Sequence, residues 1–269
     1  MAATVEEADI IILNTCSVRE KAVQKVRSEV GRLKSIRQNK PNLIIGIAGC
    51  VAEHATDDLK TKFPGVDFVV GPDHLEGVVE LVRQCLQDGP FDSPSTSSGS
   101  LRAGSSTEIQ SRKRWTGTAD EEHKNFLCAT PAQGEHSVKA PVVIQKGCDN
   151  YCSYCIVPYV RGSEVSRPPQ EILDEIRSLV DRGVKEVTLL GQNVNSYGAK
   201  SSPGITFAKL IETIAAQTGL KRLRFATSHP KDVSDALIEQ FATNPILMPH
   251  FHLPAQCGSD RLLTMMNRG

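Results

Sequence analysis

Aromatic residues, surplus charge and long apolar runs are all scarce in this sequence. Aromatics make up 5% of the 269 residues, with a single tryptophan, and 31 Lys and Arg balance 31 Asp and Glu. A net charge of zero gives no electrostatic footprint for nucleic acid. No run reaches the roughly 20 apolar residues of a membrane helix, and the start has no basic region leading into the apolar stretch of a signal peptide. These absences predict a cytoplasmic protein with no membrane partner.

Eight cysteines are the most informative component of what is present. In a reducing compartment, cysteines suggest metal or redox chemistry more than disulfide bridges. Hydrophobic residues make up 39% of the chain and charged residues 23%, which supports roughly two domains with cores of their own.

Composition divides the chain into residues 1–88, 89–140 and 141–269. In the first and third stretches, apolar runs alternate with helical patterns. Between residues 89 and 107, fourteen of nineteen residues are Gly, Pro, Ser or Thr, a composition that cannot bury enough surface to order itself. We therefore interpret 89–140 as a linker or a mobile insertion between two domains.

The first domain is predicted to be α/β with a doubly wound parallel sheet. Continuous apolar runs, typical of strands buried on both faces, occupy residues 10–13, 43–47 and 68–70. Ser17 and Glu20 have capping-box spacing before an apolar helical stripe over 22–33, and another helix is expected over 75–86. Alternation of strands and helices favours a parallel, doubly wound sheet.

The second domain repeats this alternation and is predicted to be a partial, incomplete β/α barrel. Strands are expected at 142–144, 187–190, 223–226 and near 247–253, and helices at 170–182, 207–217 and 234–241. Four β–α steps are too few to close an eight-fold barrel. The sequence stops just after a further helical pattern over 259–266.

The strongest local signal is the spacing C-x3-C-x2-C formed by Cys148, Cys152 and Cys155. These residues follow the first strand of the second domain, and α/β folds place their ligands at the carboxyl ends of parallel strands. Structural zinc needs four protein ligands, whereas a cubane iron–sulfur cluster accepts three cysteines and leaves one iron open to a small ligand. The alternative is a zinc-binding or simply reduced loop.

With Tyr154 just before its last cysteine, this segment resembles the radical S-adenosylmethionine superfamily. The resemblance implies that the three cysteines hold a 4Fe–4S cluster whose open iron binds the amino and carboxylate groups of S-adenosylmethionine. It also implies that Tyr154 lies near the adenine of that cofactor.

Polar turns follow three later strands at the same predicted end of the barrel. They contain Gln192 and Asn193, Ser228, and Gln256. Uncharged amides and hydroxyls at several strand ends suit a ribose and a methionyl group, so we predict that these four residues bind the cofactor. Ordinary capping and turn roles are the alternative for each of them.

Cys16 and Cys50 each follow a predicted strand of the first domain. The carboxyl ends of parallel strands meet at one edge of a sheet, so the two thiols look like part of a metal site. Cys16 would also lie at a helix N-terminus, where the dipole favours a thiolate. Two buried or redox-silent cysteines are the alternative.

Five segments together resemble the tRNA methylthiotransferases, in particular those that act on carbon 2 of isopentenylated adenosine beside the anticodon. They are ADIIILNTCSVREKA, AGCVAEH, KGCDNYCSYCIVPYVRGSEVSRP, LLGQNVNSYG and HFHLPAQCGSDRLLTMMNRG. The resemblance implies a transferase in which Cys148, Cys152 and Cys155 hold the cluster that cleaves S-adenosylmethionine to a 5′-deoxyadenosyl radical. It also implies that Cys16 and Cys50 are two of three ligands to an auxiliary 4Fe–4S cluster that carries the sulfur.

In that family the third auxiliary cysteine belongs to an earlier β–α unit, which would lie before Met1, and a small β-barrel that binds RNA follows the barrel. We therefore expect a chain shortened at both ends. The resemblance implies a tRNA substrate, and we expect a monomer, but the sequence does not identify the sulfur donor or the flavodoxin-type reductant. Two alternatives stay open: a methylthiotransferase for threonylcarbamoyl-adenosine or a ribosomal protein, and a non-catalytic cysteine-rich metal-binding module.

Overall fold

The computed structural model describes residues 2, 4–15, 20–53, 63–72, 75–88, 115–116, 137–200 and 204–268. The chain divides into two compact units, residues 1–124 and 125–269, so that the boundary falls inside the polar stretch 89–140. Within the described ranges, no helix has both the length and the apolar character needed to span a bilayer.

The first unit contains a four-stranded sheet in which every neighbouring pair is parallel. Its strands, in spatial order, are β1 (Ile10–Thr15), β2 (Ile44–Gly49), β3 (Phe68–Val70) and β4 (Trp115–Thr116). The helices are α1 (Glu20–Asn39), the short α2 (Cys50–Glu53) and α4 (Val78–Asp88), preceded by the 3-10 turn η1 (Leu75–Gly77). β4 comes from within the segment that the sequence assigns to a linker.

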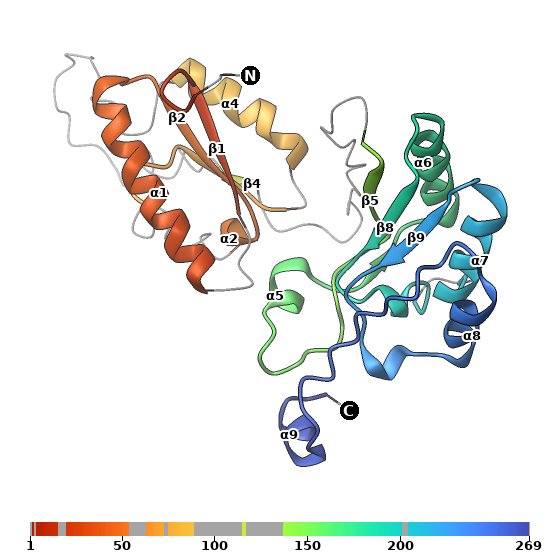
Figure 1. Ribbon diagram of the computed structural model, residues 1–269. Coiled ribbons are helices and arrows are strands. Elements are labelled where there is room, and N and C mark those ends of the chain that lie inside the picture. The colour runs from red at the N-terminus through yellow and green to blue at the C-terminus, as the bar shows by residue number, and fades with distance from the viewer. Residues whose placement is uncertain are drawn as a thin grey trace. The chain divides into compact units, whose positions relative to one another are not determined.

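Helices cover this sheet on both faces, which makes it doubly wound (Figure 1). Ile45 and Ile47 of β2 pack in one cluster with Leu33 of α1, whereas Ile44 and Ala48 pack in another with α4. Successive strand residues point to opposite faces, so a strand covered on both sides must be apolar throughout. All six residues of β2 are indeed buried.

The second unit is built on a three-stranded parallel sheet, β5 (Lys139–Val143), β8 (Glu186–Leu190) and β9 (Arg222–Phe225). Three helices gather along one side of it: α6 (Pro169–Asp181), α7 (Phe207–Gln217) and α8 (Asp235–Thr243) (Figure 1). A partial barrel has this one-sided helical cover. The last helix, α9 (Asp260–Met265), follows the loop after α8.

The strand expected near 247–253 is wrong, because only an isolated bridge between Leu223 and Leu247 forms there. Met248 still donates its N–H to the Leu223 carbonyl at 2.9 Å. Pro249 comes next and has no N–H to give to the ladder, so pairing stops after one step.

A small antiparallel hairpin, β6 (Gln145–Lys146) with β7 (Val165–Ser166), was not predicted from the sequence. It closes the ends of residues 147–164, called here the cysteine loop, which also carries the short helix α5 (Val157–Arg161). The 3-10 turns η4 (Val194–Ser196) and η5 (Pro230–Asp232) follow β8 and β9.

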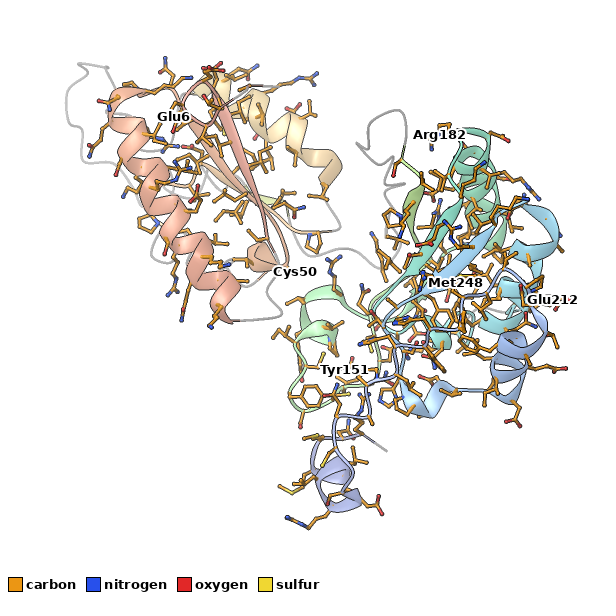
Figure 2. All side chains as sticks on the ribbon, viewed as in Figure 1. Glu6, Cys50, Tyr151, Arg182, Glu212 and Met248 are labelled. Carbon is orange, nitrogen blue, oxygen red and sulfur yellow. The ribbon has the colours of Figure 1, made fainter. Side chains whose placement is uncertain are left out.

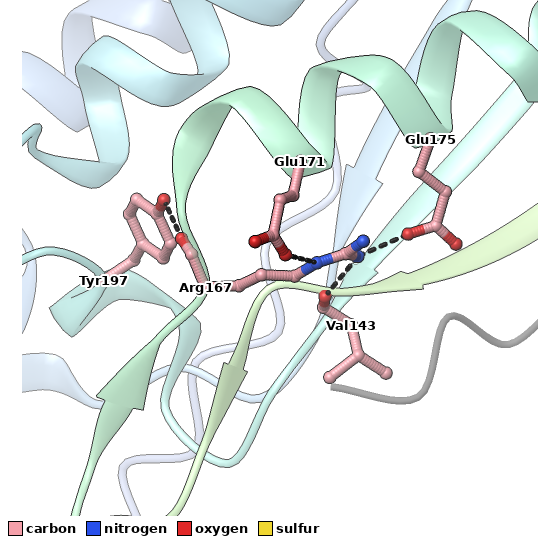
Figure 3. Close-up of polar contacts among 5 residues, drawn as sticks. All are labelled: Val143, Arg167, Glu171, Glu175 and Tyr197. Carbon is pink, nitrogen blue, oxygen red and sulfur yellow. Dashed lines mark hydrogen bonds and ion pairs between the residues drawn. The ribbon is translucent and has the colours of Figure 1, made fainter. Parts of the chain in front are cut away.

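Arg167 fastens the base of the cysteine loop to the sheet and to α6 (Figure 3). Its buried guanidinium donates to the Val143 carbonyl of β5 at 3.3 Å and pairs with Glu171, at 3.3 Å, and with Glu175. The Tyr197 hydroxyl donates to the Arg167 carbonyl at 2.6 Å. The exit of the cysteine loop is therefore tied to three separate elements.

Candidate metal centre

The cysteine loop begins with a turn that only glycine adopts without strain. Gly147 has φ +74°, and a Cβ there would lie 2.0 Å from the Ser163 carbonyl oxygen. The Cys148 N–H donates to the Gly162 carbonyl at 3.2 Å, so the two ends of the loop close against each other immediately after the hairpin. Glycine at this position is therefore what lets Cys148 turn into the loop.

The three cysteines of the loop share one partly buried environment. Cys148 and Cys152 are each 8% exposed and Cys155 is half-buried. Cys155 donates its N–H to the Cys152 carbonyl at 2.9 Å, which folds the C-x2-C step into a tight turn. The pKa of Cys148 is raised mainly by burial, and the charges of Glu164, Cys155 and Cys152 raise it further. The three thiols are thus electrostatic neighbours.

Tyr154, between Cys152 and Cys155 in the sequence, is half exposed. Its hydroxyl accepts a hydrogen bond from the guanidinium of Arg268 at 3.3 Å. Burial and the neighbouring Cys152 raise the pKa of the phenol, so Tyr154 remains a neutral hydroxyl. Sequence reasoning missed Arg268, which has no spacing that would single it out.

The side-chain oxygen of Gln192 is already hydrogen-bonded to the cysteine loop. Its side-chain oxygen accepts the Gly147 N–H at 2.7 Å, so the turn after β8 is bonded directly to the start of the loop. Gln145, just before that glycine, donates to the Ser196 hydroxyl at 3.1 Å. The polar turn predicted to bind a cofactor therefore also positions the cysteines.

Asn193 and Ser228 are the two predicted polar residues that the structure buries with unsatisfied atoms. Asn193 is 2% exposed and donates to Asp232 at 2.7 Å, while its side-chain oxygen has no hydrogen-bond partner. Ser228 is 5% exposed and its hydroxyl oxygen has none either. The Val194 N–H donates to the Thr227 carbonyl at 2.9 Å, which brings the two strand-end turns together. Buried polar atoms without partners are rare and call for a ligand or ordered water.

Backbone strain concentrates in these loops. Among the described residues, the non-glycine positions with positive φ are Tyr151, Thr227, Gln256 and Asn267. Tyr151 belongs to the cysteine loop (Figure 2), Thr227 directly precedes Ser228, and Gln256 is itself a predicted site residue with an exposed side chain. Such strain persists only where the surroundings over-determine it, as at functional sites.

Glu164 is a further candidate site residue, and no sequence pattern pointed to it. Its carboxyl is buried, and this burial, together with the charge of Asp149, raises its pKa to about 7. A hydrogen bond with Ser196 lowers the pKa and so offsets part of this effect. The Glu164 N–H donates to the Asp149 carboxylate at 3.0 Å, and Lys200 pairs with that carboxylate at 2.5 Å. Asp149 and Glu164 both belong to the cysteine loop, and Lys200 reaches them from outside it.

Cys50 lies at the start of α2, directly after β2 (Figure 2), and is 3% exposed. Gly49 before it has φ +94°, and a Cβ there would lie 2.3 Å from the Thr15 carbonyl oxygen. Thr15 and Gly49 are register partners at the ends of β1 and β2. Cys16 and its predicted helix cap at Ser17 lie outside the described residues.

No group of three or more His, Cys, Asp or Glu side chains in the described ranges is arranged around a single metal ion. A polynuclear cluster places each thiolate on its own iron, so its ligands need not converge on one point. The donor set of the cysteine loop, three thiols with unsatisfied polar atoms in nearby turns, fits a cluster with a small polar ligand.

Family models match both units of the chain. Residues 1–71 match the family described as uncharacterized protein family UPF0004, and residues 142–269 match the radical SAM superfamily.

Curated relatives align over almost the whole chain. A tRNA-2-methylthio-N(6)-dimethylallyladenosine synthase of Syntrophus aciditrophicus is 46% identical over 265 residues, which cover 98% of this chain and 52% of that protein. One of the same name from Geobacter sulfurreducens is 47% identical over 264 residues, covering 98% and 54%. The chain spans about half the length of the curated relatives it matches.

Solved structures share the fold at low identity. The cobalamin-dependent S-adenosylmethionine radical enzyme OxsB gives a TM-score of 0.57 at 14% identity, over 98% of this chain and 37% of that one. The radical S-adenosylmethionine methyltransferase TsrM from Kitasatospora setae gives 0.55 at 15% identity, over 96% and 50%.

Proposed function

We propose that this chain, whose residues 1–71 match UPF0004 and whose residues 142–269 match the radical SAM superfamily, is part of a tRNA methylthiotransferase. The proposed reaction adds a methylthio group to carbon 2 of an isopentenylated adenosine beside the anticodon. It is supported by relatives that carry this activity in their names and align with 98% of the chain. The proposed place of action is the cytoplasm, and the proposed partner is tRNA.

We infer that Cys148, Cys152 and Cys155 hold a 4Fe–4S cluster. The observation that carries this inference is the gathering of three thiols in one partly buried loop, closed by the turn at Gly147. When bound, such a cluster supplies the electron that cleaves S-adenosylmethionine. The protein would contribute the fixed loop, the exclusion of water and the unsatisfied polar atoms available to a cofactor.

The unsatisfied atoms of Asn193 and Ser228 are the best candidates for direct contact with the cofactor, because both atoms are buried and neither has a hydrogen-bond partner within the protein. Tyr154 and the exposed Gln256 complete the proposed set. Gln192 acts differently, since its amide oxygen is already bonded to Gly147 and so positions the cluster loop.

We propose that Cys50, together with Cys16, serves an auxiliary 4Fe–4S cluster in the first unit. Support comes from the register of β1 and β2, which aligns Thr15 with Gly49, the residues directly before the two cysteines. A third ligand would complete this site, and iron content distinguishes one cluster from two.

The test is anaerobic reconstitution of the full chain, followed by iron analysis and incubation with S-adenosylmethionine and a reductant. Wild type is expected to turn brown, and Cys152→Ala to lose about four irons per chain and all production of 5′-deoxyadenosine. Cys257→Ser is the matched control, because it removes a half-buried thiol that is not a proposed ligand. A Cys152→Ala protein that still forms 5′-deoxyadenosine would overturn the cluster assignment.

The same preparations test the auxiliary site and the target. Cys50→Ala is expected to lose about four irons per chain relative to wild type, and unchanged iron would contradict the auxiliary cluster. Thiomethylation of isopentenylated tRNA, measured by nucleoside mass spectrometry against threonylcarbamoylated tRNA, tests the substrate. Modification of the second RNA alone would contradict the proposed target.

A further inference from the structure

Arg268 is a buried cation without a carboxylate partner among the described residues. The residue is only 7% exposed. One terminal nitrogen lies 3.5 Å from Cys152 Sγ and 3.3 Å from the Tyr154 hydroxyl, and the other donates to the Pro254 carbonyl at 2.5 Å. Its Nε has no hydrogen-bond partner.

Such a charge is costly unless an anion offsets it. Removing a guanidinium from water without a counter-ion is unfavourable, and buried cations are normally paired. His229 does not help, because its pKa is lowered by burial and then by Arg268 itself, so the imidazole stays neutral. The anionic group within hydrogen-bond reach of Arg268 is the sulfur of Cys152 once it is a thiolate.

The backbone around Arg268 grips the cysteine loop independently of this charge. Ser153 donates its N–H to the Met266 carbonyl at 2.9 Å and its hydroxyl to the Met265 carbonyl at 3.3 Å. The Asn267 side chain donates to the carbonyls of Asn150 and Tyr151 at 3.3 and 3.0 Å. The turn after α9 therefore fixes Arg268 against the middle of the loop.

We propose that Arg268 is a positioning residue whose guanidinium hydrogen-bonds the Cys152 ligand sulfur and sets the reduction potential of the cluster. The proposal rests on the proposed function, since it takes Cys152 to be a cluster ligand. One-electron reduction makes a cluster more negative, and hydrogen bonds and positive charge at its sulfurs favour that state. Arg268 thus raises the midpoint potential and makes the cluster easier to reduce.

The test compares midpoint potentials of the anaerobically reconstituted full chain, measured by redox titration with the electron paramagnetic resonance signal of the reduced cluster as readout. Arg268→Gln keeps a donor but removes the charge, and its midpoint potential is expected to shift to a more negative value. Arg268→Lys keeps the charge without the planar fork and is expected to lie between Arg268→Gln and wild type. If Arg268→Gln does not retain its cluster, the lysine variant carries the comparison.

Two controls separate tuning from loop support. Asn267→Ala removes two neutral hydrogen bonds to the loop, so it is expected to retain less iron while keeping the wild-type potential in the fraction that holds a cluster. Arg261→Gln removes an exposed positive charge of α9 and should change neither quantity.

An unchanged midpoint potential in Arg268→Gln, or equal shifts in Arg268→Gln and Asn267→Ala, would overturn the proposal. Failure of the underlying function looks different. In that case wild type itself holds no cluster in the second unit, or Cys152→Ala retains one.

Discussion

At the level of single residues, Glu186 shows how one buried carboxylate ties three strands together. It stands at the start of β8, and its side chain is 6% exposed. Arg222 of β9 bonds it at 2.8 Å, Lys139 of β5 at 3.3 Å and Arg224 of β9 at 3.4 Å. The hydrogen bond from Arg222 is the main cause of a lowered pKa for Glu186, with Lys139 and Arg224 adding to it.

The lowered pKa predicts a definite pH dependence of stability. Stabilisation by Glu186 is fully present above the unfolded-state pKa, ordinarily 4.5, and is lost as pH falls through the lower folded-state value. Glu186→Gln should lower the free energy of unfolding at neutral pH, because it removes the charge that pairs with three cations. The expected loss is only about 1 kcal/mol, since those cations are partly exposed. The difference from wild type should vanish in acid.

Urea unfolding, followed by circular dichroism at neutral pH and again at a pH below the folded-state pKa of Glu186, measures this difference. Glu212→Gln is the control, since Glu212 makes an exposed pair with Lys209 within α7. A Glu186→Gln deficit that persists unchanged in acid would mean that packing, not charge, accounts for it.

The roles of single polar residues were only partly predictable. Sequence pattern selects Gln192, Asn193 and Ser228 alike, as polar residues after strands. Their structural situations differ, because Gln192 is bonded to the cysteine loop while Asn193 and Ser228 keep unsatisfied atoms. Which donor meets which acceptor depends on residues dozens of positions away, which no local pattern encodes.

At the level of elements, α6 is anchored to the sheet by charge as well as by its apolar face. Ile172 and Ile176 are fully buried in the core of the second unit. Arg167, just ahead of the helix, is 3% exposed and pairs with Glu175, which is 11% exposed (Figure 3). Both charges are thus largely removed from water.

Breaking this buried pair should be much more damaging than breaking an exposed one on the same helix. Arg167→Ala leaves Glu175 buried and unpaired, and is expected to cost about 3–5 kcal/mol of stability. Arg177→Ala removes an exposed pair with Asp174 and should cost at most about 1 kcal/mol. Denaturant titration of both variants measures the contrast, and equal losses would contradict the assigned role of Arg167.

Element type followed well from periodicity, whereas element ends and short pairings did not. The apolar runs at 10–13, 43–47 and 68–70 all became parallel strands. The strand expected near 247–253 failed at Pro249, and the hairpin of β6 and β7 has only two residues a side, too few to show a period.

At the level of the whole molecule, each unit has a hydrophobic core of its own. Phe225 lies at the centre of an aromatic group in the second unit, with ring centroids 5.1 Å from Phe207, 5.9 Å from Phe241 and 5.3 Å from Phe251. Phe68 is fully buried in the first unit, beside Gly46, whose lack of a Cβ leaves room for the ring.

Separate cores predict that damage to one unit stays within it. Phe225→Ala and Phe68→Ala should each cost about 3–5 kcal/mol, and each only in its own unit. Hydrogen exchange measured peptide by peptide should accelerate within 137–268 for the first variant and within 4–88 for the second. Acceleration across both units in either variant would show that they unfold as one.

Sequence information alone determined the fold class and most of the alternation of strands and helices, and it singled out the cysteine triplet as the candidate cluster site. These follow from local periodicity and from spacing, which a chain carries before it folds. The three-dimensional fold decided which polar atoms are satisfied, that Arg167 anchors the loop and that Arg268 meets Cys152. Those outcomes depend on burial and on contacts between distant segments, since a hydrogen bond or a desolvated charge exists only once both partners have been brought together.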